Sequence, residues 1–81
     1  MEKRLTVLNI IVSDREAAAK VNELLHTYSQ YVLGRMGLPY GERGVSIICV
    51  VLDIPAAESS ALSGKLGMLP SVSAKVITPK L

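Results

Sequence analysis

Two side chains, His26 and Cys49, are of the types that bind metals or act as nucleophiles. They are the single histidine and the single cysteine of the chain, whereas a structural zinc site takes four ligands. His26 falls on the flank of an apolar helical stripe and Cys49 inside an apolar strand, so nothing predicts that they lie within hydrogen-bond reach. We expect a partly packed histidine, a buried structural thiol, no catalytic residue, no bound metal and no other cofactor.

The stretch GRMGLPYGERG, residues 34–44, combines four of the six glycines with two arginines. Backbone N–H groups in such a run can wrap an anion, but the phosphate fingerprints GxxxxGK[ST] and GxGxxG are both absent. We expect Gly34 and Gly37 to allow a strand bulge or the close approach of a neighbouring backbone. Gly41 and Gly44 are expected to supply the positive φ angles of a tight connection.

Three polar side chains are candidates for a ligand-binding or interface role. Arg35, between two glycines at a predicted sheet edge, is placed to pair with a carboxylate across an interface or to hold an anionic ligand. Tyr40 lies in the same stretch, and Asn9 interrupts an otherwise apolar strand, where a buried amide must find partners. The alternative for Asn9 and Arg35 is a hydrogen bond satisfied within the chain.

The size and composition of the chain predict one domain, residues 1–81, that associates with copies of itself. At 81 residues, 49% of them hydrophobic, the chain is near the size at which one core supplies only about 3–5 kcal/mol of net stability. A single cysteine cannot form a disulfide within the chain. No apolar run approaches the roughly 18 residues that span a bilayer, so we expect the surplus apolar surface to meet protein and not membrane.

The charges indicate neither nucleic-acid binding nor export. The net charge is +2, and the nine Lys and Arg residues are scattered from Lys3 to Lys80 without forming a basic stripe. The opening MEKR is not followed by the apolar segment of a signal peptide, and a lone thiol suits a reducing compartment. We expect a cytoplasmic protein that does not bind nucleic acid directly.

Hydrophobic periodicity predicts the element order βαββαβ. The predicted strands are residues 4–12, 31–38, 45–52 and 71–78, and the predicted helices are residues 14–30 and 55–67. Ser13 and Glu16 fit a capping box at the start of the first helix. In the second helix, Pro55 is expected in the first turn and Gly67 at the C-cap, with an apolar stripe of Ala57, Ala61, Leu62 and Leu66.

This order is the ferredoxin-like motif, an α+β fold with a four-stranded antiparallel sheet and both helices on one face. The first and third predicted strands, however, are apolar on both faces. Leaving about half a dozen such side chains in water would forgo on the order of 10 kcal/mol, at about 1.5–3 kcal/mol each. We therefore expect a homo-oligomer, a dimer or a tetramer, that buries the helix-free sheet face.

Three segments, LGRMGLPYGERGVSII, ALSGKLG and PSVSAKVITPK, resemble the family of iron-only hydrogenase system regulators, and the resemblance extends over essentially the whole chain. It implies a stand-alone domain similar to ACT domains and to the C-terminal domain of the nickel-responsive repressor, with a role in transcriptional regulation of the hydrogenase system. The chain departs from these relatives because it has no ribbon-helix-helix segment, no set of nickel ligands and no glycine turn before its first helix.

Two hypotheses of function follow. The first is a ligand-sensing or protein-binding regulatory module, linked to iron-only hydrogenase maturation or expression, in which a small anionic or amino-acid-like effector contacts Arg35 from an interface that Asn9 and Tyr40 also line. The alternative is a structural accessory protein for the assembly of a metalloenzyme, with no small-molecule ligand. Acylphosphatases share the topology, but their glycine-rich phosphate loop is missing from the junction VSDREAA. We therefore do not expect an enzyme.

Overall fold

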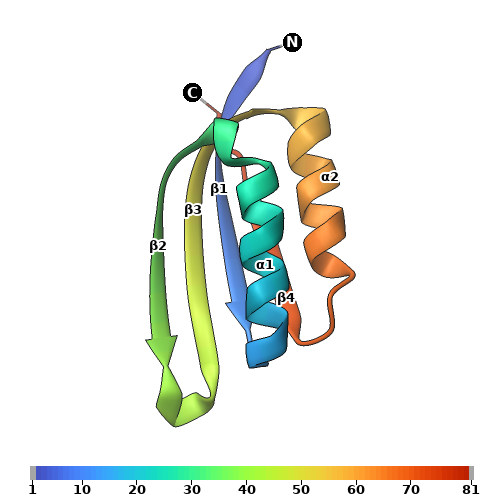
Figure 1. Ribbon diagram of the computed structural model, residues 1–81. Coiled ribbons are helices and arrows are strands. Elements are labelled where there is room, and N and C mark those ends of the chain that lie inside the picture. Colours follow the sequence, from blue (N-terminus) through green and yellow to red (C-terminus); the bar gives the residue numbers. More distant parts are fainter. Residues whose placement is uncertain (1, 81) are drawn as a thin grey trace.

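The computed structural model describes residues 2–80 and has the predicted order βαββαβ. The elements are β1 (Lys3–Val12), α1 (Arg15–Thr27), β2 (Val32–Tyr40), β3 (Val45–Pro55), α2 (Ala56–Gly67) and β4 (Val72–Ile77), with single 3₁₀ turns at Ser29–Tyr31 and Gly41–Arg43. The strands form one antiparallel sheet in the order β2-β3-β1-β4, and both helices lie on one side of it (Figure 1). The predicted ferredoxin-like fold is confirmed. Within residues 2–80, no helix is long and apolar enough to cross a membrane.

The core lies between the helices and one face of the sheet. From Thr6 to Val12 in β1 and from Ile47 to Ile54 in β3, the even-numbered residues are buried and the odd-numbered residues are more exposed, as expected for side chains that alternate between the faces of a strand. The buried apolar residues of the sheet are Leu8, Ile10, Val12, Ile48, Val50, Leu52 and Ile54, and those of the helices are Ala17, Val21, Leu25, Leu62 and Leu66. One face of the sheet is thus closed within the chain.

The start of α1 differs from the predicted capping box. Asp14, and not Ser13, is the N-cap, and its Oδ1 accepts a hydrogen bond of 3.1 Å from the backbone N–H of Glu16. Ser13 instead donates its backbone N–H and its hydroxyl to the carbonyl of Ser71, at 2.9 and 3.2 Å. The prediction was wrong because this contact with the residue before β4 is long-range and leaves no local signal.

The second helix also differs in its ends. Pro55 is the last residue of β3 and the N-cap of α2, with an extended ψ of 143°, so the prediction that it lies in the first helical turn was wrong by one position. Gly67 ends the helix as its last residue, and Met68 is the C-cap. The helix turns Ala57 and Ala61 to the outside, because only the leucines of its predicted stripe reach the sheet.

The four glycines of residues 34–44 have different roles. Gly44 has a φ of 65°, whereas Gly41 has no positive φ, so only one of the two expected left-handed residues is present. The pairing of β2 with β3 shifts register between Val32 and Gly34, which places the expected bulge beside Gly34. At Gly34 and Gly37 no heavy atom of a non-neighbouring residue in the described chain lies within 4 Å of an added Cβ atom.

We expect Gly44→Ala to lower the free energy of unfolding by about 1–2 kcal/mol, because an L-residue is strained at positive φ while space for the methyl group is available. Gly41→Ala is the matched control in the same turn, and it should change stability by less than about half of this. Urea unfolding of the three proteins at one protein concentration measures the difference. Equal losses in both variants would contradict the assignment.

Candidate functional site

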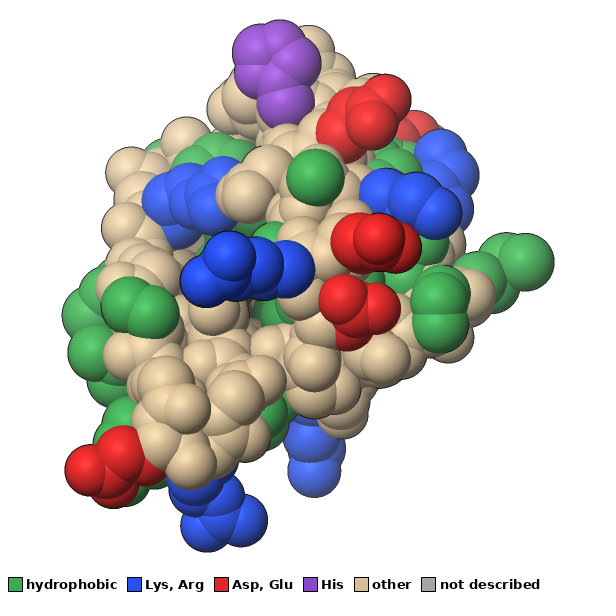
Figure 2. Space-filling model, turned by 60° about the horizontal axis from the view of Figure 1, so that its bottom comes forward, with side chains coloured by type: hydrophobic (Ala, Val, Ile, Leu, Met, Phe, Trp, Pro, Cys, Tyr) green, Lys and Arg blue, Asp and Glu red, His purple; other side chains and the backbone are tan. Residues whose placement is uncertain are grey.

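The sheet face without helices, here called the open face, is largely apolar. Its side chains are Leu5, Val7, Asn9 and Ile11 of β1, Met36, Leu38 and Tyr40 of β2, Val45, Ile47, Cys49, Val51 and Asp53 of β3, and Ser73, Lys75 and Ile77 of β4. Met36 and Leu38 are 65% and 55% exposed, and Ile77 and Ile11 are 50% and 47% exposed. Figure 2 shows hydrophobic side chains gathered along the edge that carries β2. A contiguous apolar surface of this kind is typical of an interaction site.

A row that contains two polar residues crosses the middle of the open face. Met36, Cys49, Asn9 and Lys75 are register partners on four successive strands. The rows on either side of Asn9 are mostly apolar, with Val7 and Ile11 as its neighbours along β1. Asn9 is half-buried, and within residues 2–80 its side chain makes no hydrogen bond. Cys49 is likewise half-buried and belongs to the open face. The prediction of a thiol buried in the core was therefore wrong.

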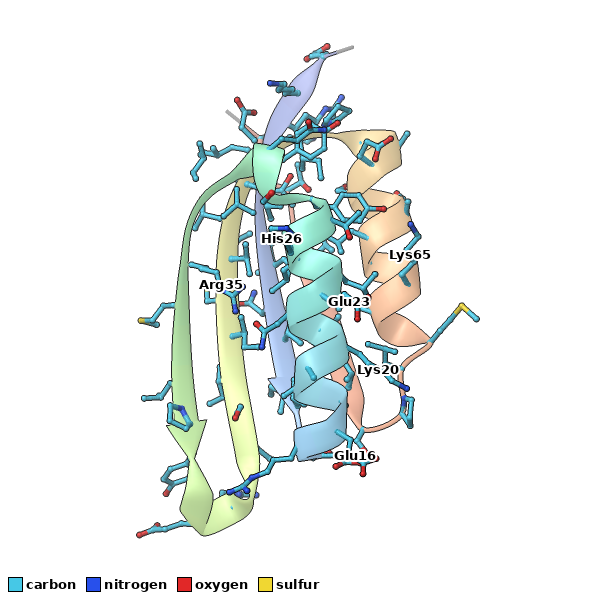
Figure 3. The ribbon with its side chains drawn as sticks, viewed as in Figure 1. Glu16, Lys20, Glu23, His26, Arg35 and Lys65 are labelled. Atoms are coloured by element: carbon cyan, nitrogen blue, oxygen red, sulfur yellow. The ribbon has the colours of Figure 1, made fainter. Side chains whose placement is uncertain are left out.

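Arg35 lies on the opposite side of the sheet from Asn9 and Tyr40. Its register partner is the buried Val50, and its side chain points from β2 toward α1 (Figure 3). Arg35 Nη2 donates a hydrogen bond of 2.6 Å to Asn22 Oδ1, and both residues are exposed. The structure therefore separates Arg35 from the other two candidate residues, and it adds Asn22, which the sequence did not indicate because the contact joins two elements.

A hollow of about 330 Å³ lies between the start of α1 and the end of the β2–β3 hairpin. Its lining includes Asp14, Arg15 and Ala18 from the helical side and Pro39 from β2. Arg35 and Asn22 do not line this hollow. Their contact lies farther along the same side of the sheet, since Asn22 follows Ala18 by one helical turn and Arg35 shares a strand face with Pro39. The hollow and the neighbouring Arg35–Asn22 contact are together called the α1–β2 groove below.

Tyr40 lies at the end of β2, where the open face and the hollow meet. It is the register partner of Val45, and its hydroxyl donates a hydrogen bond of 3.1 Å to Glu42 Oε2. Tyr40 is also part of the lining of the hollow. It thus approaches both surfaces, although its hydroxyl is already engaged within the hairpin.

His26 and Cys49 are not brought together. His26 is exposed on α1 (Figure 3), whereas Cys49 belongs to the open face, so the sheet stands between them. Among residues 2–80 there is no group of three or more His, Cys, Asp and Glu side chains that could hold a metal ion. The arrangement offers no catalytic pair built on either residue.

A second hollow, of about 350 Å³, lies between the two helices beside Lys20, Glu23 and Lys65. Figure 3 shows these three side chains on the outer surface of α1 and α2. Lys65 Nζ donates a hydrogen bond of 3.1 Å to the hydroxyl of Tyr28 and lies 5.3 Å from the centre of its ring. Both hollows thus combine basic and acidic side chains, but only the first has guanidinium groups, in its lining and in the neighbouring Arg35, that can bind a carboxylate or a phosphate through paired hydrogen bonds.

Comparisons with known proteins agree on fold and family. A family model with the description "TM1266-like: Iron-only hydrogenase system regulator, putative" matches residues 4–76. The solved structure of the TM1266 protein from Thermotoga maritima is 41% identical, with a TM-score of 0.94, and the match covers 98% of this chain and all of that one. No curated protein matches the chain.

Two more distant structures share the fold alone. The C-terminal domain of the MgtC protein from Mycobacterium tuberculosis is 14% identical, with a TM-score of 0.72 over 95% of this chain and 88% of that one. A formyltetrahydrofolate deformylase from Pseudomonas putida is 15% identical, with a TM-score of 0.68, and the match covers 93% of this chain but only 29% of the enzyme. The fold thus occurs both as a separate domain and as part of a larger protein.

Proposed function

Because the chain belongs to the family of iron-only hydrogenase system regulators, we propose that it is a regulatory module, not an enzyme, that associates with itself through the open face and senses a small anionic effector in the α1–β2 groove. The regulatory role rests on the family. The two surfaces rest on the geometry of the sheet.

The observation that carries the proposal is the position of two consecutive residues of β2. Arg35 turns toward α1 and the groove, and Met36 turns to the open face. β2 is an edge strand, held in the sheet by β3 alone. A ligand that repositions this strand at Arg35 therefore also repositions the exposed side chain of Met36, and in this way the groove is coupled to the open face.

The groove suits a carboxylate or a phosphate. Arg35 presents a guanidinium, which binds such groups through paired hydrogen bonds, and Arg15 lines the adjoining hollow. Asn22 holds Arg35 through a neutral acceptor, so the positive charge is oriented without being neutralised. Asp14 is the one carboxylate in the lining of the hollow, and it already accepts the N–H at the start of α1.

Regulation follows when the effector binds one association state better than another. A ligand shifts an equilibrium only by its differential affinity for the two states, and the coupling is reciprocal. An effector that orders β2 in the conformation required at the open face would strengthen association. Association would in turn raise the affinity for the effector.

We expect Arg35→Gln to abolish the thermal stabilisation that an effector gives the parent protein. A panel of amino acids, small carboxylates and phosphates is screened, and saturation to a hundredfold over Kd should stabilise the parent by about 2.7 kcal/mol, equivalent to roughly 11–22 °C in a domain of this size. Arg43→Gln, in the exposed hairpin turn, is the matched control and should keep the shift. Asn22→Asp retains Arg35 but places a carboxylate beside its guanidinium. Because this carboxylate would compete with an anionic effector for Arg35, the variant should also show a smaller thermal stabilisation.

Two results would count against this proposal. If both Arg35→Gln and Asn22→Asp bind the effector with the affinity of the parent, the effector does not bind in the α1–β2 groove. The absence of any shift across the panel, together with co-purification of a maturation enzyme, would favour the structural accessory role.

A further inference from the structure

We propose that Asn9 determines how two copies of this chain pair across the open face, by hydrogen bonding with the same amide of the second copy. The inference rests on the proposed function in one respect, that a second copy covers this face. It adds the orientation of that copy and the residue that specifies it.

The dimensions and charge of the open face fit a second copy. β1 has 10 residues, which at about 3.3 Å each extend for roughly 33 Å. Four strands about 4.8 Å apart are roughly 19 Å wide, so the footprint is on the order of 600 Å². Stable interfaces bury roughly 600–1,000 Å² on each partner. Asp53 and Lys75 carry opposite charges, and Lys3 adds one positive charge at the end of β1, so each copy brings a net charge of only +1 to the interface.

Asn9 lies near the centre of this face. β3 and β1 are the two inner strands. Three rows of the open face, those of Val7, Asn9 and Ile11, extend over all four strands, and the row of Asn9 is the middle one. Packing a second sheet at about 10 Å would remove the amide from water, with Lys75 as the one charged residue paired beside it. An amide buried without a partner costs roughly 1–3 kcal/mol, and the chain itself offers none within residues 2–80.

The symmetry of a dimer supplies the missing partner. An isologous two-fold interface brings a residue near the axis against its own copy. A carboxamide both donates and accepts hydrogen bonds, so two of them satisfy each other. This requires a two-fold axis that runs across the strands at the row of Asn9, which places β1 of one copy over β1 of the other. The same axis places Lys75 over its own copy, but Lys75 is exposed on the edge strand β4, from which both ammonium groups extend into water.

A dimer whose two-fold axis runs parallel to the strands would satisfy the carboxamide of Asn9 less well. An axis parallel to the strands would place Asn9 over Cys49, its register partner on β3. A thiol is a weak donor and a weak acceptor, so the amide would be only partly satisfied. Asn9 thus discriminates between two orientations that the apolar side chains tolerate about equally, as a single buried asparagine does in coiled coils.

The test compares the parent with Asn9→Val and Cys49→Val by sedimentation equilibrium and by counting backbone amide resonances. The parent and Cys49→Val should each give one oligomer and one resonance per amide. Asn9→Val should associate at least as tightly, with a dissociation constant about tenfold lower, but should give several sets of resonances. Valine favours strands, and circular dichroism checks that the variant folds.

The outcomes separate the inference from the proposal on which it rests. A single set of resonances in an oligomeric Asn9→Val would overturn the role of Asn9 and leave self-association intact. Loss of the single set in Cys49→Val as well would show that the amide pairs with the thiol, which overturns the orientation. A parent protein that sediments as a monomer would refute self-association itself.

Discussion

Val50→Asp should leave no folded protein at any concentration. Val50 is fully buried between the sheet and the helices, in the strand that pairs with both β2 and β1. A carboxylate there would lose its hydration without gaining a partner, a cost of several kcal/mol even after it takes up a proton. A single core of this size supplies only about 3–5 kcal/mol of net stability. Circular dichroism should show loss of both helices.

Val50→Ala separates loss of packing from burial of charge. It should retain the fold and lose about 1–3 kcal/mol in urea unfolding, because it removes two methyl groups and buries nothing polar. A native spectrum for Val50→Asp would place the core elsewhere and contradict the assignment of the two sheet faces.

Val51→Asp should have the opposite phenotype, a folded chain that no longer associates. Val51 is the next residue on β3, half-buried on the open face beside Val7. In one chain the new carboxylate remains hydrated, so the cost to folding is small. In a symmetric dimer it introduces two charges into an apolar interface, and each must be desolvated there. Sedimentation equilibrium should change from a multiple of 8.7 kDa to 8.7 kDa.

Ser60→Asp is the matched control for this experiment. It adds the same charge on the exposed surface of α2, on the helical side of the sheet, and should leave the mass of the parent unchanged. Association that survives Val51→Asp would exclude the open face as the interface. Unfolding of Val51→Asp would show that the chain depends on this face for its own stability.

Local patterns in the sequence were sufficient to predict the fold and to predict that the open face is largely apolar. The alternation of side chains along β1 and β3 assigns Leu8 and Val50 to one face and Val7 and Val51 to the other, because the period of a strand is two residues. The element order then leaves only one of these faces for the two helices. Pro55 was placed within one residue, and Gly44 was correctly expected to adopt a positive φ.

Only the tertiary structure decided which polar groups meet. Arg35, Asn9 and Tyr40 were expected along one interface, but the pairing of β2 with β3 turns Arg35 toward Asn22, 13 residues before it, and leaves Asn9 on the other face. Similarly, Ser13 bonds to Ser71, 58 residues away, and leaves the helix cap to Asp14. A one-residue change of register reverses the side on which a strand residue lies, and the bulge beside Gly34 makes such a change. Periodicity within a segment therefore determined the composition of each face, whereas pairing between distant segments determined the contacts.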